Sequence, residues 1–372
     1  MLKSIHIQNY RNLSDLEIKS LGAVNLFTGR NNTGKTTLLE AIAIFTSGAS
    51  RKLILEILND RGELFNNSDK NSFHRFNRSE LNFNVLLSLF SRESFFVRPF
   101  LTMTDNYKTV TLSIESFYDT EDFDLDGNRI HKRVFVSENS EIESTVKNLK
   151  YAFVVSNIAK GVSQKQIFVL EDDLLEYNYR LETVNYPIEY IGTRNLDREI
   201  NGILWDRITL TDKEQHVINA LRIIEPKTER INFIENSMGD RSVVIKIAET
   251  PAVLPLKSMG DGINRILTII LALVNAENGY LLIDEFENGL HYSVQEQLWK
   301  IIFELSAKLN VQVFVTTHSE DSIRGFEQVL NDPSNKTEGK LIRLDNVNGE
   351  IQEVEYTASD LKIATDNDIE VR

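Results

Sequence analysis

The chain has 372 residues, a formal net charge of −14 and no cysteine. The length is sufficient for one large or two ordinary domains with a real core. The acidic balance argues against a protein that coats nucleic acid by bulk electrostatics, and the missing cysteines exclude disulfides, thiolate zinc sites and a cysteine nucleophile. Cysteine usage fits a reducing cytoplasm, where we expect the protein to act. The N-terminal stretch MLKSIHIQNYRN turns polar too soon for a secretory signal.

The first motif is GRNNTGKT at 29–36, which fits the pattern G-x-x-x-x-G-K-[ST]. It follows the apolar run AVNLFTG, a predicted buried strand, and precedes TTLLEAIAIF, a predicted helix. In this context the loop would cradle phosphate, with Lys35 on the β- and γ-phosphates and the Thr36 hydroxyl on Mg²⁺. The alternative is a plain strand–turn–helix with a surface lysine. The predicted ATP-binding residues are Gly29, Arg30, Asn31, Asn32, Thr33, Gly34, Lys35, Thr36 and Thr37.

Residues 96–244 change character along their length. Strand-like alternation comes first, as in KTVTLSIESF, RVFVSENS and QIFVLED, and TDKEQHVINALRII then predicts a helix with a capping box from Thr211 to Glu214. The stretch DFDLDGN at 122–128 fits the start of a calcium loop, but the twelfth position is Arg133 instead of glutamate. Its Asp-Gly pair predicts a hairpin.

The stretch KSMGDGINRILTIILAL at 257–273 places a serine and glycines before an apolar helix. One interpretation is a helix N-cap at Ser258 or Asp261. The other is a second anion-binding helix start, too far from the first loop to share its phosphate within one subunit, that closes on the nucleotide of another subunit. The apolar run ILTIILALV at 266–274 is about half the length of a membrane span, so we expect a buried helix.

Two further predicted strands end on polar residues. In GYLLIDEFENGLH at 279–291 the apolar run stops at two carboxylates, and Asp284 would hold Mg²⁺ while Glu285 directs the attacking water. The alternative is a strand that ends at acidic loop residues. In VQVFVTTHS at 311–319 the strand ends near His318, which would hydrogen-bond the γ-phosphate or be structural. Lys35, Glu285 and His318 are the predicted catalytic residues, and Thr36 and Asp284 the predicted metal ligands.

The order of these motifs resembles the ABC-type ATPases of the SMC, RecF and OLD class, and OLD-like ATPases of bacteria and phage most closely. The resemblance implies a Walker A loop at 29–37, a Walker B pair at Asp284 and Glu285, and His318 as switch histidine. It implies a signature loop acting in trans at Ser258, Met259, Gly260 and Asp261, a D-loop at Asn288, Gly289 and His291, and a nucleotide contact by Arg11 in NYRN. The Q-loop has no placed glutamine, with 83–94 as the nearest candidate region.

The predicted fold is therefore an α/β, ABC-type P-loop NTPase head with a compact α+β insertion. We expect an N-terminal lobe at 1–95, the insertion at 96–244, a C-terminal lobe at 245–345 and a tail at 346–372. The insertion is too short and mixed for coiled-coil arms. The Asn-Gly pair in LDNVNGEIQEV predicts a C-terminal hairpin. The tail lacks the acidic cluster of a TOPRIM nuclease, so we expect no intrinsic nuclease.

Three functions follow from this resemblance. The first is a Mg²⁺-dependent ATPase that oligomerises through its heads, as a homodimer or larger, and controls a separate nuclease or toxin in phage defence. The second is a RecF-like clamp that binds DNA through a basic face, which a salt titration would reveal. The third is a scaffold that binds ATP with negligible turnover. The candidate DNA-binding residues are Arg75, Arg78, Arg92, Arg98, Arg194 and Arg198.

Overall fold

The computed structural model describes residues 1–64, 78–91, 99–123, 129–136, 149–171, 187–193, 198–235, 241–250, 252–260, 262–367 and 369–372. The chain forms two compact units. The P-loop unit consists of Met1–Ser4, Glu17–Ser47 and Val184–Arg372, and the strand-rich unit of Ile5–Leu16 and Gly48–Thr183. Across the described ranges, the chain has no helix that is both long and apolar enough to span a bilayer.

The P-loop unit is built on a six-stranded sheet in the order β16-β15-β3-β14-β13-β9. All neighbouring pairs are parallel except β15 and β16, which form an antiparallel hairpin. The strands are β3 (Val24–Thr28), β9 (Ile188–Ile191), β13 (Tyr280–Ile283), β14 (Gln312–Thr316), β15 (Gly339–Val347) and β16 (Glu350–Tyr356). Every residue of β3 and β14 is buried, as expected for parallel strands covered on both faces. The predicted strands around the three motifs are thereby confirmed.

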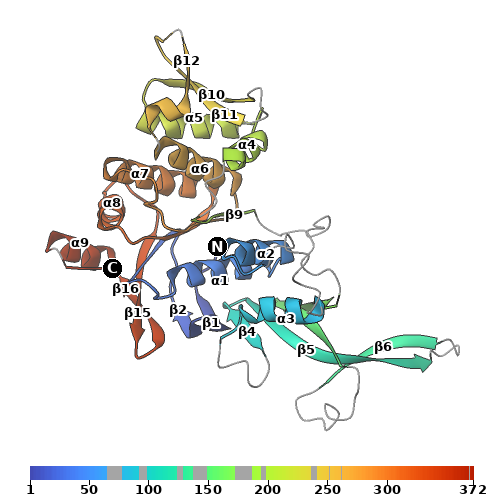
Figure 1. Cartoon of the computed structure of the whole chain (residues 1–372). Coiled ribbons are helices and arrows are strands. Elements are labelled where there is room, and N and C mark those ends of the chain that lie inside the picture. The colour runs from blue at the N-terminus through green and yellow to red at the C-terminus, as the bar shows by residue number, and fades with distance from the viewer. Residues whose placement is uncertain are drawn as a thin grey trace. The chain divides into compact units, whose positions relative to one another are not determined.

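Helices cover both faces of this sheet. Figure 1 shows α6 and α7 on one side of β9 and α1 on the other. The helices of this layer are α1 (Lys35–Ser47), α6 (Gly262–Asn275), α7 (Tyr292–Leu309) and α8 (Glu320–Leu330). The apolar run at 266–274 is buried within α6, as predicted. Trp299 of α7 stacks on Phe286 with ring centroids 4.4 Å apart, and its indole N–H donates to the carbonyl of Ser322.

A small antiparallel sheet with two helices belongs to the same unit. The strands of this sheet are β10 (Thr228–Glu235), β11 (Arg241–Ile247) and β12 (Val253–Pro255), and the helices are α4 (Arg198–Asp206) and α5 (Lys213–Ile224). Helices α4 and α5 pack against α6 and bury Leu204 and Leu221 in the core of the unit. The two units therefore differ from the predicted insertion at 96–244. The second part of that insertion packs with the P-loop unit, because its helices α4 and α5 share the apolar surface of α6.

The predicted capping box at the start of α5 is wrong. The helix begins at Lys213 and its N-cap is Asp212, which makes no side-chain cap hydrogen bond. The hydroxyl of Thr211 donates to the carbonyl of Ile208, and the Glu214 carboxylate accepts from the backbone N–H of Leu210. The side chains that a capping box would use are therefore hydrogen-bonded to the preceding turn instead.

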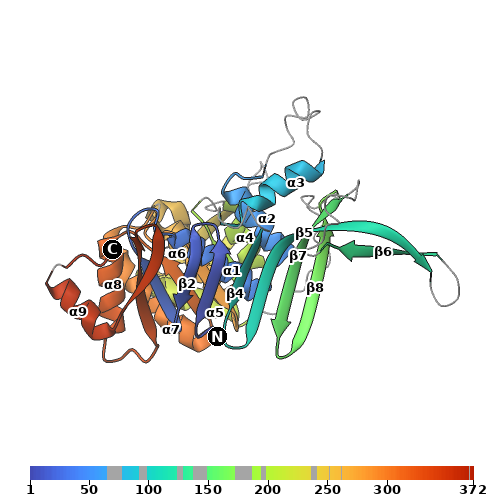
Figure 2. The same ribbon diagram turned by 90° about the horizontal axis from the view of Figure 1, so that it is seen from below.

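The strand-rich unit contains most of a second sheet, in the order β2-β1-β4-β5-β7-β8, with β6 paired to β5. Its strands run side by side in Figure 2. The elements are β1 (Ile5–Tyr10), β2 (Leu13–Ile18), which crosses the unit boundary, α2 (Arg51–Asp60), α3 (Arg78–Leu87), β4 (Phe100–Thr104), β5 (Lys108–Phe123), β6 (Arg129–Phe135), β7 (Lys150–Ala159) and β8 (Val162–Val169).

Two hairpins predicted from Asp-Gly and Asn-Gly pairs are confirmed. Strands β5 and β6 pair antiparallel up to Phe123 and Arg129, although residues 124–128 of the candidate calcium loop lie outside the described residues. Strands β15 and β16 join through Asn348 and Gly349, which have φ angles of 56° and 96°. Two consecutive positive φ angles are what a two-residue hairpin turn of type I′ requires. Helix α9 (Ala358–Asp366) follows.

Candidate active site

The loop between β3 and α1 has the backbone of an anion cradle. Gly29, Asn32 and Gly34 have φ angles of 135°, 64° and 86°, and such left-handed positions turn successive N–H groups toward one concave side. A side chain at Gly29 has no room, because a Cβ atom there would lie 2.4 Å from the carbonyl oxygen of Leu344 in β15. The hydroxyl of Thr33 donates to the Arg30 carbonyl at 2.9 Å and braces the turn.

Lys35 points its ammonium group back into this loop. Its Nζ donates to the carbonyl oxygens of Gly29 and Arg30 at 2.7 and 2.8 Å, and the residue is 5% exposed. Burial lowers the pKa of Lys35 to about 8, although the carboxylates of Asp284, Glu287 and Glu285 oppose this shift. The lysine is therefore mostly protonated at neutral pH and lies within electrostatic reach of all three carboxylates.

The end of the P-loop meets the end of strand β13. The hydroxyl of Thr36 lies 3.1 Å from both carboxylate oxygens of Asp284, which is 3% exposed. Asp284 also accepts a 2.6 Å hydrogen bond from the hydroxyl of Thr316, the last residue of β14. A hydroxyl and a carboxylate are oxygen donors of the kind that Mg²⁺ prefers, with nucleotide phosphates and water completing the set. Within the described ranges, no group of three or more His, Asp or Glu side chains is placed to hold a metal by itself.

Glu285 is held by its neighbours at both backbone and side chain. Its φ angle is 48°, an unusual value for a residue with a side chain. Its backbone N–H donates to the Thr316 hydroxyl at 2.9 Å, and its Oε2 accepts from Nδ2 of Asn288 at 2.6 Å. Asn288 is one of the predicted D-loop residues, so the D-loop directly orients the predicted base.

The loop with the predicted switch histidine is tied to Glu287. The Thr317 hydroxyl and the His318 backbone N–H donate to the two carboxylate oxygens of Glu287, each at 2.7 Å. Burial and the charge of Lys35 lower the pKa of His318, against the opposing carboxylates of Glu287, Glu285 and Asp284. This lowered pKa favours the neutral imidazole, which has one donor and one acceptor nitrogen.

The predicted signature loop lies at the start of α6. Ser258 and Gly260 are exposed, and the Ser258 hydroxyl donates to the Pro255 carbonyl within the short helix η4 (Leu256–Met259). Asp261 lies outside the described residues. A Cβ atom on Gly262 would meet the carbonyl oxygen of Gly289 at 3.0 Å, so the start of α6 packs closely on the D-loop. No hydrogen bond between described residues joins Ser258 or Gly260 to the P-loop of the same chain.

A buried arginine on α6 also contacts the Walker B segment. Arg265 is 2% exposed and its Nη2 donates to the backbone carbonyls of Asp284 and Glu285 at 3.1 and 3.3 Å. Burial lowers its pKa, but a guanidinium stays charged. Sequence reasoning missed this residue, although a lone arginine in a helix of mostly apolar residues was a usable signal.

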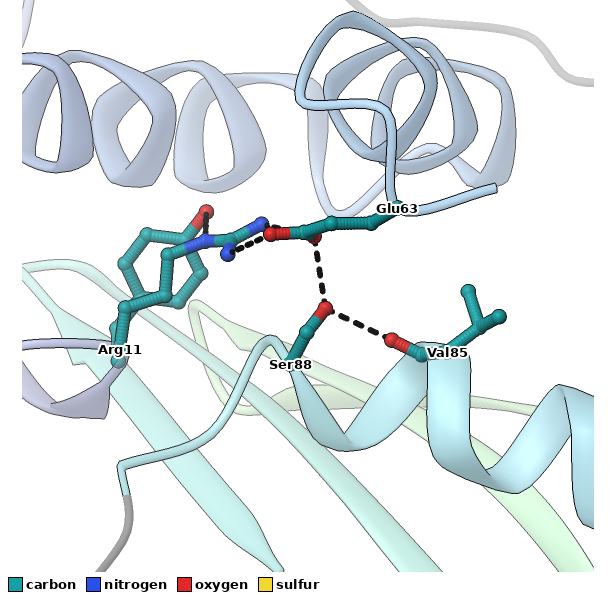
Figure 3. A network of polar contacts seen from close by, with 5 residues as sticks. Arg11, Glu63, Val85 and Ser88 are labelled. Carbon is teal, nitrogen blue, oxygen red and sulfur yellow. Dashed lines mark hydrogen bonds and ion pairs between the residues drawn. The ribbon is translucent and has the colours of Figure 1, made fainter. Parts of the chain in front are cut away.

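Arg11 belongs to the strand-rich unit. It occupies the turn after β1 with a φ angle of 52°. Its Nη1 and Nη2 atoms donate to the two oxygens of Glu63 at 2.8 and 2.9 Å, its Nε donates to the hydroxyl of Tyr10, and Ser88 also donates to Glu63 (Figure 3). The guanidinium therefore already forms hydrogen bonds to Glu63 and Tyr10 within the protein. A contact between Arg11 and nucleotide stays a prediction.

The remaining predicted residues have these places. Thr37 is buried in the first turn of α1, and His291 caps α7 by accepting from the backbone N–H of Ser293. Met259 is partly buried against the core. The candidate Q-loop region is described only up to residue 91. Of the candidate DNA-binding residues, Arg75, Arg92, Arg98 and Arg194 lie outside the described residues, as do the side chains of Arg78 and Arg198.

Comparisons with known proteins agree with this site. Residues 1–323 match the family model of the AAA ATPase domain. The chain is 24% identical over 360 residues, 92% of each chain, to an ATP/GTP phosphatase of Helicobacter pylori. A stretch of 47 residues, 13% of each chain, is 45% identical to the DNA replication and repair protein RecF of Rickettsia prowazekii. An SMC head bound to the C-winged helix domain of ScpA aligns with a TM-score of 0.46 at 12% identity, over 96% of this chain and 97% of that one.

The family model spans residues 1–323, well over half of the chain, and this range includes the loop at 29–36, Asp284, Glu285 and His318. The predicted fold class, an α/β ABC-type P-loop ATPase head, is confirmed. The narrower resemblance to OLD-like ATPases stays a prediction. The chain belongs to the AAA ATPase domain family.

Proposed function

We propose that this protein is a Mg²⁺-dependent ATPase whose heads close in pairs on ATP and thereby switch a separate effector protein. The observation that carries this proposal is the junction at the carboxyl edge of the sheet. There Thr36 of the P-loop, Asp284 directly after β13 and Thr316 of β14 form one hydrogen-bonded group with Glu285 beside it.

ATP binding would use the cradle and the lysine. The N–H groups of the loop and the start of α1 favour phosphate oxygens. The Lys35 ammonium, now shared by two loop carbonyls, would donate to the β- and γ-phosphates. Thr36 and Asp284 would hold Mg²⁺, which supplies charge neutralisation at the phosphates. The 24% identity to an ATP/GTP phosphatase over nearly the full chain supports nucleotide hydrolysis.

Glu285 would direct the attacking water. Its Oε2 is engaged by Asn288, which leaves Oε1 to accept a proton or orient the water. His318, whose lowered pKa favours the neutral imidazole, would hydrogen-bond the γ-phosphate and respond to its loss. Asp284 would not serve as the base, because the hydroxyls of Thr36 and Thr316 already occupy its two oxygens.

The test of the hydrolytic role is Glu285→Gln with ATP turnover measured at saturating Mg²⁺. We expect kcat to fall by roughly 10²–10⁴ while ATP still binds. Glu304→Gln is the matched control, since Glu304 is an exposed glutamate on α7. Normal turnover in Glu285→Gln would contradict the assignment. Negligible turnover in the unchanged protein would favour a scaffold that binds ATP without hydrolysing it.

Pairing of heads would complete the nucleotide site. Ser258 and Gly260 are exposed at the start of α6, where a partner's γ-phosphate would meet backbone N–H groups and the serine hydroxyl. Light scattering of Glu285→Gln is expected to give a dimer or larger assembly with ATP and Mg²⁺, and a smaller species without nucleotide. One unchanged mass under both conditions would contradict ATP-driven pairing.

The proposed output is control of a nuclease or toxin in phage defence, a role implied by the resemblance to OLD-like ATPases. A pull-down of tagged Glu285→Gln from its native host, with and without ATP, tests this output. A stoichiometric nuclease-like or toxin-like protein held only with ATP is the expected result. Recovery of DNA without a protein partner would contradict it and favour a RecF-like repair clamp.

A further inference from the structure

We infer that Glu287 is a positioning residue for ATP hydrolysis, which fastens the loop carrying His318 to the loop carrying Asp284 and Glu285. This inference rests on the proposed function of the same site. Glu287 lies two residues after the proposed base, and none of the hydrogen bonds given above for Thr36 or Lys35 involves it. Its part in the site is set by what its two carboxylate oxygens accept.

Both oxygens of Glu287 bind the segment that follows β14. Oε2 accepts from the hydroxyl of Thr317, and Oε1 accepts from the backbone N–H of His318, each at 2.7 Å. A carboxylate is an acceptor on both oxygens, and its charge makes such bonds shorter and stronger than those to a neutral group. Glu287 therefore binds His318 through the main chain and does not use the imidazole.

The series of hydrogen bonds that starts at Glu287 continues into helix α8. The Thr317 hydroxyl accepts from the backbone N–H of Ser319 at 3.1 Å. Ser319 is the N-cap of α8, where its hydroxyl accepts from the N–H of Ser322 at 3.3 Å. The path from the end of β14 to the first turn of α8 thus depends, step by step, on the carboxylate of Glu287.

The two loops are also joined on the other side of Glu287. Glu285 donates its N–H to the Thr316 hydroxyl, and Phe286 donates its N–H to the Thr316 carbonyl at 3.0 Å. Residues 284–287 and 316–318 therefore form a continuous ladder across two neighbouring strand ends. In this ladder Glu287 supplies both bonds nearest His318, so the spacing between His318 and Glu285 depends on it.

The expected consequence of losing this carboxylate is a misplaced His318 with an intact nucleotide cradle. A reacting group displaced by about 1 Å commonly costs about a hundredfold in rate. Glu287→Ala is therefore expected to lower kcat by roughly 10²-fold with KM for ATP changed less than about threefold. Glu287→Gln should recover most of the rate, because its amide oxygen can accept from His318 and its NH₂ can donate to the Thr317 oxygen.

The experiment measures kcat and KM for Glu287→Ala, Glu287→Gln, Thr317→Val and Thr317→Ser, with Glu304→Ala on α7 as the exposed control. Peptide-level hydrogen exchange over 312–323 is the second readout, and faster exchange there in Glu287→Ala than in Glu287→Gln is expected. Thr317→Val should lose part of the rate and Thr317→Ser should keep it. If Glu287→Ala fails to fold, the Thr317 pair and Glu287→Gln decide.

The inference is overturned if Glu287→Ala turns over ATP at the normal rate, if Glu287→Gln is as impaired as Glu287→Ala, or if KM alone changes. Glu285→Gln is assayed beside these variants to separate the two claims. Normal turnover in Glu285→Gln with impaired Glu287→Ala would reject the proposed base and keep the positioning residue. Impaired Glu285→Gln with normal Glu287→Ala would reject the positioning residue alone.

Discussion

Nδ2 of Asn288 lies 2.6 Å from Oε2 of Glu285, so the Asn288 side chain holds one oxygen of the carboxylate proposed to direct water. The predicted D-loop also lies close to the start of α6, because a Cβ atom on Gly262 would lie 3.0 Å from the carbonyl oxygen of Gly289. The segment between Walker B and α7 therefore joins the proposed base to the helix that begins with the signature loop.

The hydrogen bond between Asn288 and Glu285 predicts that a mutation of Asn288 lowers kcat without changing the affinity for ATP. In Asn288→Ala the Glu285 carboxylate loses its orienting donor, and kcat is expected to fall by roughly ten- to a hundredfold. The dissociation constant for ATP should stay unchanged, since no hydrogen bond between described residues joins Asn288 to the loop at 29–36. Steady-state turnover and equilibrium ATP binding measure the two effects. Asn219→Ala, an exposed change on α5, is the control. A weaker ATP affinity with an unchanged kcat would contradict this role.

Thr316 predicts a combined loss of stability and rate. Its hydroxyl is buried, donates to Asp284 and accepts from the N–H of Glu285. Thr316→Val keeps the shape, but buried Asp284 loses a hydrogen-bond donor and the part-buried N–H of Glu285 loses its acceptor, which costs about 1–3 kcal/mol in the free energy of unfolding. Urea unfolding measures this loss, and the ATPase assay should show a lower kcat. Thr316→Ser should restore both, whereas a valine variant as stable and active as the unchanged protein would contradict the contact's importance.

The buried lysine predicts a pH dependence of ATP binding. Burial lowers the pKa of Lys35 from 10.5 to about 8. ATP needs the protonated form, so its affinity should fall as pH rises above 8, by up to about tenfold per unit. Binding at pH 8.5 should also take up protons. The free energy of unfolding changes with pH in the opposite direction from the ATP affinity. The contribution of Lys35 to it is greatest above pH 10.5 and decreases as pH falls to 8.

Calorimetry without Mg²⁺, in two buffers of different ionisation enthalpy, measures both the affinity and the proton uptake. Lys35→Met is the control, because its residual binding has no lysine to titrate. Equal affinity of the unchanged protein from pH 7 to pH 9.5, with no proton uptake, would contradict the lowered pKa.

The Arg11–Glu63 pair predicts a pH-dependent stability of the strand-rich unit. Burial acts to raise the pKa of Glu63, but the hydrogen bonds and charge of Arg11, with Ser88, outweigh it and lower that pKa below 4.5. The pair's stabilisation is therefore present above pH 4.5 and is lost as pH falls through the lowered pKa. Glu63→Gln should cost about 1–3 kcal/mol in the free energy of unfolding at pH 7, and less at pH 3.

Urea titrations at pH 7, 5 and 3 measure this difference. Glu121→Gln is the control in the same unit, because the ion pair of Glu121 with Arg129 is largely exposed and contributes little. A Glu63→Gln deficit that stays the same from pH 7 to pH 3 would contradict a depressed Glu63 pKa.

The sequence was sufficient for the parts of the site that are local in the chain. Strands β3, β13 and β14 read as apolar runs because both faces of a parallel sheet are covered, and the P-loop has fixed spacing. Asp284 was found because a carboxylate at the end of such a strand has few other reasons to be there. Its contact with Thr36 joins residues 248 positions apart, yet the shared sheet edge made it predictable.

The hydrogen bonds between the two loops could not be predicted in the same way. Thr316 and Asp284 are 32 positions apart, and Thr317 and Glu287 are 30 apart. Their pairing depends on the register of neighbouring strands, which one sequence does not specify. The packing of α4 and α5 on α6 could not be predicted for a related reason: it depends on tertiary contacts, and the pattern of each helix shows only that it has an apolar face.

Mixing two inactive variants tests most directly whether two paired heads share their nucleotide sites. Lys35→Ala removes the phosphate-binding lysine, and Ser258→Arg obstructs the exposed loop proposed to act across the pair. Each alone should show almost no turnover. In a mixture, half of the pairs are mixed and each has one complete site of two, so activity should return to roughly a quarter of normal. Normal turnover by Ser258→Arg alone, or a mixture that stays inactive, would contradict paired heads that share their nucleotide sites.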